Sequence, residues 1–314
     1  MAETPLALPD GICYNFCMMD HLLESCTLCP RRCGVNRLAG ETGYCGAKKE
    51  ANIARAALHH WEEPCISGET GSGTVFFSFC TMRCVFCQNA LFDSGKGKDV
   101  APGQLGQIFL DLQEQKANNI NLVTPTHYMP QIAGAVDIAK AKGLSIPIVY
   151  NTSGFETAQS IEYLKNTVDI FLPDFKYFDD SYARKYSGVP TYVEYASSAI
   201  RQMVMQTGPA IFDGNGIMRK GVIVRHLVLP GLIEDAKNVI RYVYETFGDD
   251  VYLSIMNQYT PLRGVQEYPE INKTVDPADY EAVVEYALSL GVVNGFIQEE
   301  GTVGESFIPE FTVE

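Results

Sequence analysis

An alternation of apolar, strand-like runs with amphipathic helical patterns begins near residue 73, and it limits the possible folds more than any other feature. Short runs rich in β-branched residues predict strands, and each run is followed by a stretch of helical periodicity. Strands separated by helices at this spacing form βαβ units, which build a parallel sheet. The six predicted strands cover 74–77, 120–123, 146–150, 168–172, 222–229 and 251–255.

The helices between these strands are predicted from apolar residues three and four positions apart. Pro102 suits a first helical turn, and Gly143 suits a helix end. Asp276 followed by Pro277 predicts the start of the last helix. The predicted helices cover 102–116, a stripe through 132–139, 155–166, 192–206, 233–247 and a final helix from 277.

These elements predict an α/β fold with a partial or complete parallel (β/α) barrel, because right-handed crossovers allow either closure or an open sheet. Functional residues should then lie at the carboxyl ends of the strands. We expect three parts: a Cys-rich N-terminal segment at 1–72, the barrel core at 73–261, and a C-terminal helix with an acidic tail closing the core at 262–314.

Composition limits the partners of this chain. The 314 residues are 46% hydrophobic and 20% charged, which is typical of a globular protein. The 24 basic and 38 acidic residues give a net charge of −14, which disfavours a nucleic-acid partner. There is no apolar run of about 18 residues and no signal-peptide pattern, so we expect a cytoplasmic protein without a membrane partner.

All ten cysteines lie within the first 87 residues. In a reducing compartment, clustered cysteines favour metal ligation over disulfides. Cys80, Cys84 and Cys87 fall on a predicted loop that leaves the first strand. Three thiolates suit a four-iron cluster with one iron left open, whereas a closed zinc site wants four ligands. The alternative is three buried structural cysteines or part of a zinc site.

The C-x3-C-x2-C spacing, with Phe86 before the last cysteine, resembles the radical S-adenosylmethionine (SAM) superfamily. The wider string GSGTVFFSFCTMRCVFCQN resembles its pyruvate formate-lyase activating enzyme branch. The resemblance implies a [4Fe-4S] cluster on Cys80, Cys84 and Cys87 whose open iron binds SAM. It also implies a 5′-deoxyadenosyl radical that abstracts hydrogen from substrate. A flavodoxin- or ferredoxin-like electron donor would be a partner, and a protein substrate a further one.

Polar residues follow the second and third predicted strands. Thr124 and His127 stand where much of the superfamily has a Gly-Gly-Glu stretch, which this chain lacks. Thr124 could contact the cofactor through its hydroxyl group, and His127 could bind cofactor or substrate or simply pack. Asn151 can donate to and accept from a ribose or carboxylate, although its surroundings also suit an ordinary turn.

Charged residues follow the fourth and fifth predicted strands. Asp174 and Lys176 resemble the family's Asp-x-Lys motif, and positions i and i+2 of an extended chain point the same way. Lys176 would meet a carboxylate and Asp174 could steady a cation or the sulfonium group, and a plain surface ion pair is the alternative. Alternation places Arg225 on the face opposite His226. An interior arginine needs an anionic partner, and a cofactor carboxylate would be one.

A second cysteine group precedes the core. Cys26, Cys29, Cys33 and Cys45 can close a tetrahedral site that would suit zinc or a second iron–sulfur cluster. Unmetallated thiols are the third possibility, and spacing alone does not choose among them. Three other cysteines have no clear partners and are expected to be small buried hydrophobes: Cys13, Cys17 and Cys65.

The expected function is therefore that of a radical SAM enzyme, with activation of a glycyl radical enzyme as the first specific hypothesis. One alternative is a radical SAM enzyme that acts on a small molecule or peptide. Another is a non-catalytic iron–sulfur or zinc redox protein. A wide groove at the strand ends would favour a protein substrate, and a closed pocket would favour a metabolite.

Overall fold

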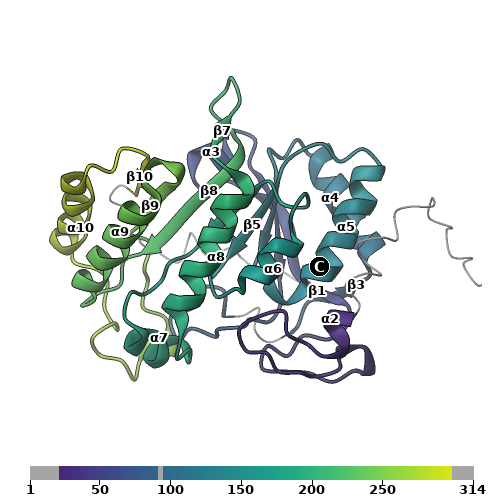
Figure 1. Ribbon diagram of the computed structural model, residues 1–314, viewed down its shortest axis with the longest axis horizontal. Helices are drawn as coiled ribbons and strands as arrows, with labels where there is room; N and C mark the ends of the chain where they lie inside the picture. Colours follow the sequence, from purple (N-terminus) through teal and green to yellow (C-terminus); the bar gives the residue numbers. More distant parts are fainter. Residues whose placement is uncertain (1–20, 91–94, 299–314) are drawn as a thin grey trace, which may run out of the picture.

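A computed structural model describes residues 21–90 and 95–298 and contains one curved, ten-stranded sheet (Figure 1). Its strand order is β10-β9-β8-β6-β5-β4-β2-β1-β3, and β7 pairs with β8. The strands from β2 to β10 along this order are parallel to their neighbours, which confirms the predicted parallel sheet. They are β2 (Ser72–Phe77), β4 (Ile120–Val123), β5 (Ile148–Thr152), β6 (Ile170–Pro173), β8 (Met218–Leu227), β9 (Tyr252–Met256) and β10 (Gly295–Ile297).

An antiparallel extension lies beside β2 and was not predicted. β1 (Ala51–His59) pairs with β2, and β3 (Lys98–Val100) pairs with β1. β1 lies within the Cys-rich N-terminal segment at 1–72, for which the sequence predicted no strand. That strand is rich in alanine and poor in the β-branched and aromatic residues on which strand prediction depends. The two-residue β7 (Ile211–Phe212) forms a hairpin with β8.

Helices cover the outer face of the sheet (Figure 1). α9 has the predicted bounds, and the N-cap carboxylate of α10 is Asp276, as predicted. α6 is shorter than predicted because Thr157, not an earlier residue, caps it. α7 was not predicted. The helices are α2 (His21–Glu24), α3 (Pro64–Ser67), α4 (Pro102–Glu114), α5 (Met129–Ala141), α6 (Ala158–Tyr163), α7 (Asp180–Ser187), α8 (Tyr192–Thr207), α9 (Ile233–Phe247) and α10 (Pro277–Leu290), with 3-10 turns at Arg37–Ala39, Thr126–Tyr128, Gly248–Asp250 and Arg263–Val265.

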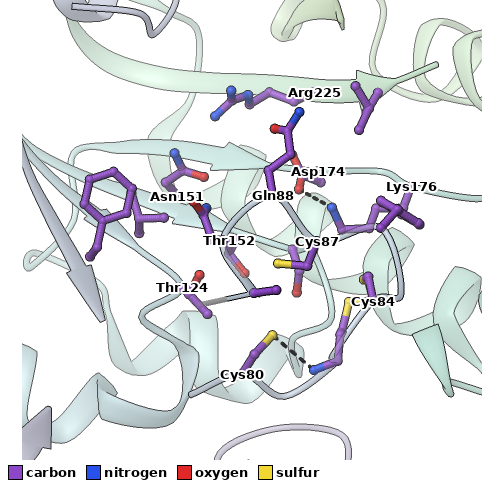
Figure 2. Close-up of a pocket in the computed structure, with 18 of the residues that line it drawn as sticks. Cys80, Cys84, Cys87, Gln88, Thr124, Asn151, Thr152, Asp174, Lys176 and Arg225 are labelled. Atoms are coloured by element: carbon purple, nitrogen blue, oxygen red, sulfur yellow. Dashed lines mark hydrogen bonds and ion pairs between the residues drawn. The ribbon is translucent and has the colours of Figure 1, made fainter. Parts of the chain in front are cut away.

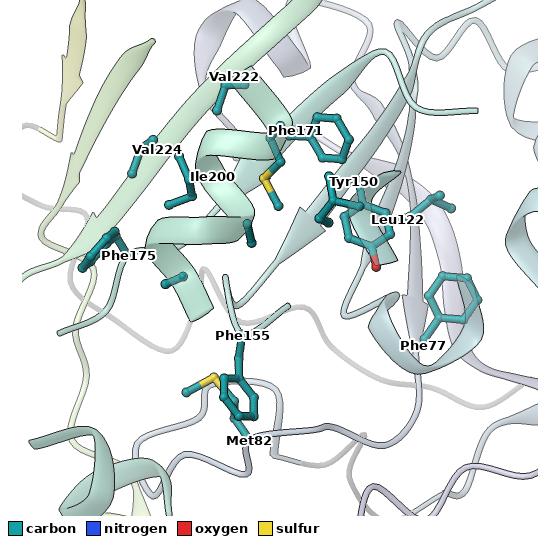
Figure 3. Packing of buried hydrophobic residues seen from close by; sticks show 14 of the residues in the cluster. Phe77, Met82, Leu122, Tyr150, Phe155, Phe171, Phe175, Ile200, Val222 and Val224 are labelled. Atoms are coloured by element: carbon teal, nitrogen blue, oxygen red, sulfur yellow. The ribbon is translucent and has the colours of Figure 1, made fainter. Parts of the chain in front are cut away.

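The core has an outer and an inner part because side chains alternate along each strand. The outer part packs between sheet and helices and includes Leu122, Tyr150, Phe171, Val222 and Val224 (Figure 3). The inner part fills the concave side of the sheet, where α3 packs against the strands. Its members are Cys65, Ile66, Val149, Ile170, Leu172, Met218 and Ile223, so Cys65 is buried as predicted.

No helix in the described ranges is long and apolar enough to cross a membrane. The predicted acidic tail beyond residue 298, together with Cys13 and Cys17, lies outside the described residues.

Candidate active site at the carboxyl ends of the strands

A cavity of about 280 Å³ opens at the carboxyl ends of β2, β4, β5, β6, β8 and β9. Figure 2 shows its walls, which combine thiols, a lysine, an arginine and carboxylate, amide and hydroxyl groups. The structure thus brings together residues that are far apart in the sequence. The predicted site residues that line the cavity are Cys80, Cys84, Phe86, Cys87, Thr124, Asn151, Asp174, Lys176 and Arg225.

The cysteine loop, residues 80–87, leaves the end of β2 through tight turns. Phe79 and Arg83 adopt left-handed backbone angles, with φ of 72° and 62°. The amide of Val85 donates to the carbonyl oxygen of Tyr186 (2.9 Å), which ties the loop to α7. Ser187 Oγ donates to the Sγ atom of Cys84 (2.9 Å). These contacts hold the loop with its thiols along one side of the cavity (Figure 2).

The three thiols suit an iron–sulfur cluster better than a single metal ion. Burial raises the pKa of Cys84 to about 11 and that of Cys87 to about 12, so ligation as thiolates requires nearby positive metal charge. Nowhere in the described parts of the chain do three His, Cys, Asp or Glu side chains converge on one ion. A four-iron cluster does not need that convergence, because each thiolate binds a different iron.

Asp174 and Lys176 form an ion pair beside the cysteine loop. Lys176 Nζ lies 2.5 Å from Asp174 Oδ2. The side chain of Lys176 is 15% exposed and that of Asp174 is 21% exposed. Burial lowers the pKa of Lys176, but the charges of Asp174 and Cys84 outweigh it and raise the net pKa, so the lysine stays charged. As predicted from their spacing, both side chains face the same cavity.

Arg225 faces the cavity, whereas His226 is buried with Nδ1 2.8 Å from the carbonyl oxygen of Phe175. The anionic partners of Arg225 come from the chain itself. Its guanidinium lies 3.1 Å from Glu62 Oε2 and 3.2 Å from Glu63 Oε1, and all three side chains are at most 11% exposed. Burial lowers the pKa of Arg225, but the two carboxylates outweigh it and raise the net pKa.

Glu62 and Glu63 were not predicted as site residues. They lie on the loop between β1 and β2, just before α3, and this loop crosses the concave side of the sheet to reach β8. Glu62 Oε1 also accepts from Asn121 Nδ2 (2.9 Å) and Asn151 Nδ2 (3.4 Å). Glu62 is therefore a hub that joins β4, β5 and β8 at the floor of the cavity. The role of Glu62 could have been predicted only from the antiparallel pairing of β1 with β2, which the sequence did not predict.

His127 is not brought to the cavity. It is 2% exposed, its Nε2 lies 2.8 Å from the carbonyl oxygen of Ser78, and burial lowers its pKa to about 3. Its own carbonyl oxygen accepts from Arg37. The packing alternative therefore describes His127 in this structure. Thr124 does line the cavity and has a left-handed φ of 59°.

A buried carboxyl group, Glu156, lies behind the cavity wall and was also missed. Its Oε1 accepts from Thr126 Oγ1 (2.6 Å), Thr152 Oγ1 (2.6 Å) and Tyr150 OH (3.4 Å). Burial raises the pKa of Glu156 to about 7, although these hydrogen bonds lower it. Because Thr152 lines the cavity, Glu156 fixes the wall from behind.

The N-terminal cysteines lie on a loop that folds back on itself. Cys26 exchanges backbone hydrogen bonds with Gly34 and Val35, both 3.0 Å. The amide of Tyr44 donates to Cys33 Sγ (3.4 Å). Burial raises the pKa of Cys29 to about 12 and raises that of Cys45, and each thiol is affected by the charges of others in the group. The four free thiols are therefore neighbours, although no three converge on one ion in the described residues.

Comparison with known families agrees with this site. The Radical SAM superfamily model matches residues 74–205. The uncharacterized protein MJ0674 of Methanocaldococcus jannaschii is 27% identical over 278 residues, which cover 85% of this chain and 75% of that protein.

Solved structures with a similar fold include several enzymes. Streptococcus suis SuiB bound to its precursor peptide SuiA aligns with a TM-score of 0.49 at 16% identity, over 71% of this chain and 47% of SuiB. Methylornithine synthase (PylB) aligns with a TM-score of 0.48 at 15% sequence identity, over 68% of this chain and 62% of that enzyme. A domain of pyruvate-formate lyase-activating enzyme from Bacteroides vulgatus aligns with a TM-score of 0.39 at 12% sequence identity, over 55% of this chain and 93% of that domain. The aligned part spans about half the length of SuiB.

Proposed function

Because the Radical SAM superfamily model matches residues 74–205, we propose that this chain is a radical SAM enzyme, which cleaves SAM reductively at a [4Fe-4S] cluster and takes a hydrogen atom from a substrate. One observation carries the proposal: three free thiols on one loop share a cavity with the polar strand ends. A reduced cluster supplies the electron for cleavage of the sulfonium bond.

The residues around the cavity have distinct roles in this proposal. Cys80, Cys84 and Cys87 hold the cluster. Lys176 offers its charge to the carboxylate of SAM, and Asn151 offers an amide donor and acceptor to its polar groups. Phe86, which is 5% exposed, keeps water from the cavity beside the cluster.

The test is anaerobic reconstitution with iron and sulfide, followed by dithionite and SAM. We expect release of methionine and 5′-deoxyadenosine by the wild-type protein and by Cys65→Ser, whose thiol is buried away from the cavity. Cys84→Ser should lose both the cluster absorbance and the products. Iron uptake without any cleavage would refute the proposal and favour a redox protein.

The specific hypothesis within this activity is hydrogen abstraction from a glycine backbone of a partner protein. The similarity of the cysteine-loop sequence to activating enzymes supports it. So does the rim of the cavity, where Trp61 is 61% exposed and within reach of a polypeptide loop. Deuterium should pass into 5′-deoxyadenosine from a protein fraction of cells grown on α-deuterated glycine. Transfer only from the small-molecule fraction would refute the activase hypothesis.

A second metal centre at Cys26, Cys29, Cys33 and Cys45 belongs to the same proposal. The neighbouring thiols, together with a surrounding segment that forms only short helical turns and loops, support it. A variant with all three cavity cysteines replaced by serine should retain metal at this centre. Zinc would indicate a structural site, iron with sulfide an auxiliary cluster, and a metal-free protein would refute the centre.

A further inference from the structure

Positive charge gathers around the cysteine loop of a strongly acidic protein. The chain has a net charge of −14, yet residues 21–49 hold five basic and only two acidic residues. Arg32 is exposed in this segment, Arg83 is exposed on the cysteine loop, and Arg184 is exposed on α7. The local balance is therefore opposite to that of the molecule as a whole.

Side-chain contacts bring these three segments together. The guanidinium carbon of Arg31 lies 3.8 Å from the ring centroid of Tyr44, and that of Arg83 lies 5.0 Å from the same centroid. Arg31 also donates to the carbonyl oxygens of Thr81 (3.0 Å) and Gly188 (3.0 Å).

Gly188 is the C-cap of α7, so Arg184 lies one helical turn before this contact. We name Arg31, Arg32, Arg83 and Arg184 the arginine patch. Lys185 is also exposed there, but it pairs with Glu270 at 2.6 Å and adds no net charge.

Two members of the arginine patch occupy strained backbone positions. Arg32 has a φ of 42° and Arg83 a φ of 62°, in the left-handed region where glycine is free of strain. Such outliers point to a use for the side chain. Arg83 stands between Cys80 and Cys84 and lines the same cavity, so its exposed side chain lies on the surface beside the thiols.

We propose that the arginine patch is the docking surface for an acidic one-electron carrier protein of the flavodoxin or ferredoxin type. The inference rests on the proposed function, because a cluster on the cavity cysteines must receive an electron. One electron passes from the carrier to the cluster, so the carrier is oxidised and the cluster is reduced by one electron. No bond forms or breaks, and no proton is transferred.

Charge complementarity supports this occupant. An acidic carrier is repelled by a protein of net charge −14, and complementary patches steer encounter to a region of opposite sign. Here that region surrounds the cysteine loop. The carrier would therefore arrive beside the group that it reduces.

The test compares the double variant Arg32→Glu/Arg184→Glu with a control that changes net charge equally, Lys142→Glu/Lys165→Glu. Both control lysines are exposed just after α5 and α6, near the amino ends of β5 and β6 and thus at the edge of the sheet opposite to the cysteine loop. The readout is the second-order rate of cluster bleaching by reduced flavodoxin in a stopped-flow instrument, at low and high salt. We expect at least a tenfold fall for the patch variant at low salt and less than a twofold change for the control.

Two further measurements separate the two proposals. Dithionite should reduce the cluster of the patch variant at the wild-type rate, and SAM cleavage driven by dithionite tests the proposed function independently of docking. Flavodoxin should also bind cluster-free wild-type protein more tightly than the cluster-free patch variant. Equal flavodoxin rates or equal affinities for patch and control variants would overturn the docking surface.

Discussion

Replacing Glu156 by glutamine should make stability less dependent on pH. The carboxyl group is fully buried and its pKa is raised from 4.5 to about 7, mainly by burial. A group whose folded pKa lies above its unfolded value stabilises the fold fully below the unfolded value, and this contribution is lost as the pH rises through the folded pKa. Glutamine carries no such charge and can still accept from Thr126 and Thr152.

The size of the effect follows from the two pKa values. Each unit of difference corresponds to about 1.36 kcal/mol, and most of the change falls between pH 5 and pH 8. Relative to the wild type, Glu156→Gln should therefore gain about 2 to 3 kcal/mol in free energy of unfolding between pH 5 and pH 8.

Urea unfolding of the cluster-free protein, followed by circular dichroism under anaerobic conditions, measures this difference. Glu162→Gln is the matched control, because Glu162 is exposed on α6, the helix that begins two residues after Glu156. The difference in free energy of unfolding between Glu162→Gln and the wild type should change by less than about 0.5 kcal/mol from pH 5 to pH 8. A Glu156→Gln difference that is the same at pH 5 and pH 8 would refute the reasoning.

Three further changes test other parts of the site. Arg225→Met leaves the buried carboxylates of Glu62 and Glu63 without their cation and should lower the free energy of unfolding in urea by about 3 to 5 kcal/mol. A loss below about 1 kcal/mol would contradict the stabilising role of these ion pairs. Lys176→Met should weaken SAM binding to the reconstituted protein about tenfold or more by calorimetry, and an unchanged affinity would remove Lys176 from the site. Gly264→Ala should lower the iron bound per chain, because its Cβ would collide with the carbonyl oxygen of Val85 on the cysteine loop, whereas Gly214→Ala has open space and should bind iron as the wild type does.

The parallel sheet and the cysteine loop could be predicted because their signals are local. Each of the six predicted strands is present, with ends within four residues of the prediction. The positions of Asp174 and Lys176 follow from two-residue alternation at the end of one strand. Their proximity to the cysteines follows from the rule that parallel strands present their carboxyl ends at one edge.

The floor of the cavity could not be predicted because it depends on contacts distant in sequence. Glu62 and Glu63 reach Arg225 only through the hairpin of β1 and β2, and β1 carries a weak strand signal. His127 shows the opposite error. Its place after a strand suggested function, but the 3-10 turn at Thr126–Tyr128 directs it into the interior.

The hairpin also changes which cation is available to a ligand. The sequence alone left Arg225 in need of an anion, and a cofactor carboxylate was the expected one. In the structure Arg225 already faces two carboxylates, whereas Lys176 faces one. A further carboxylate therefore meets less electrostatic competition at Lys176, which also lies beside the thiols of Cys84 and Cys87. Lys176→Met should accordingly weaken SAM binding more than Arg225→Lys does. The opposite order of affinities would indicate that Arg225, not Lys176, binds the carboxylate of SAM.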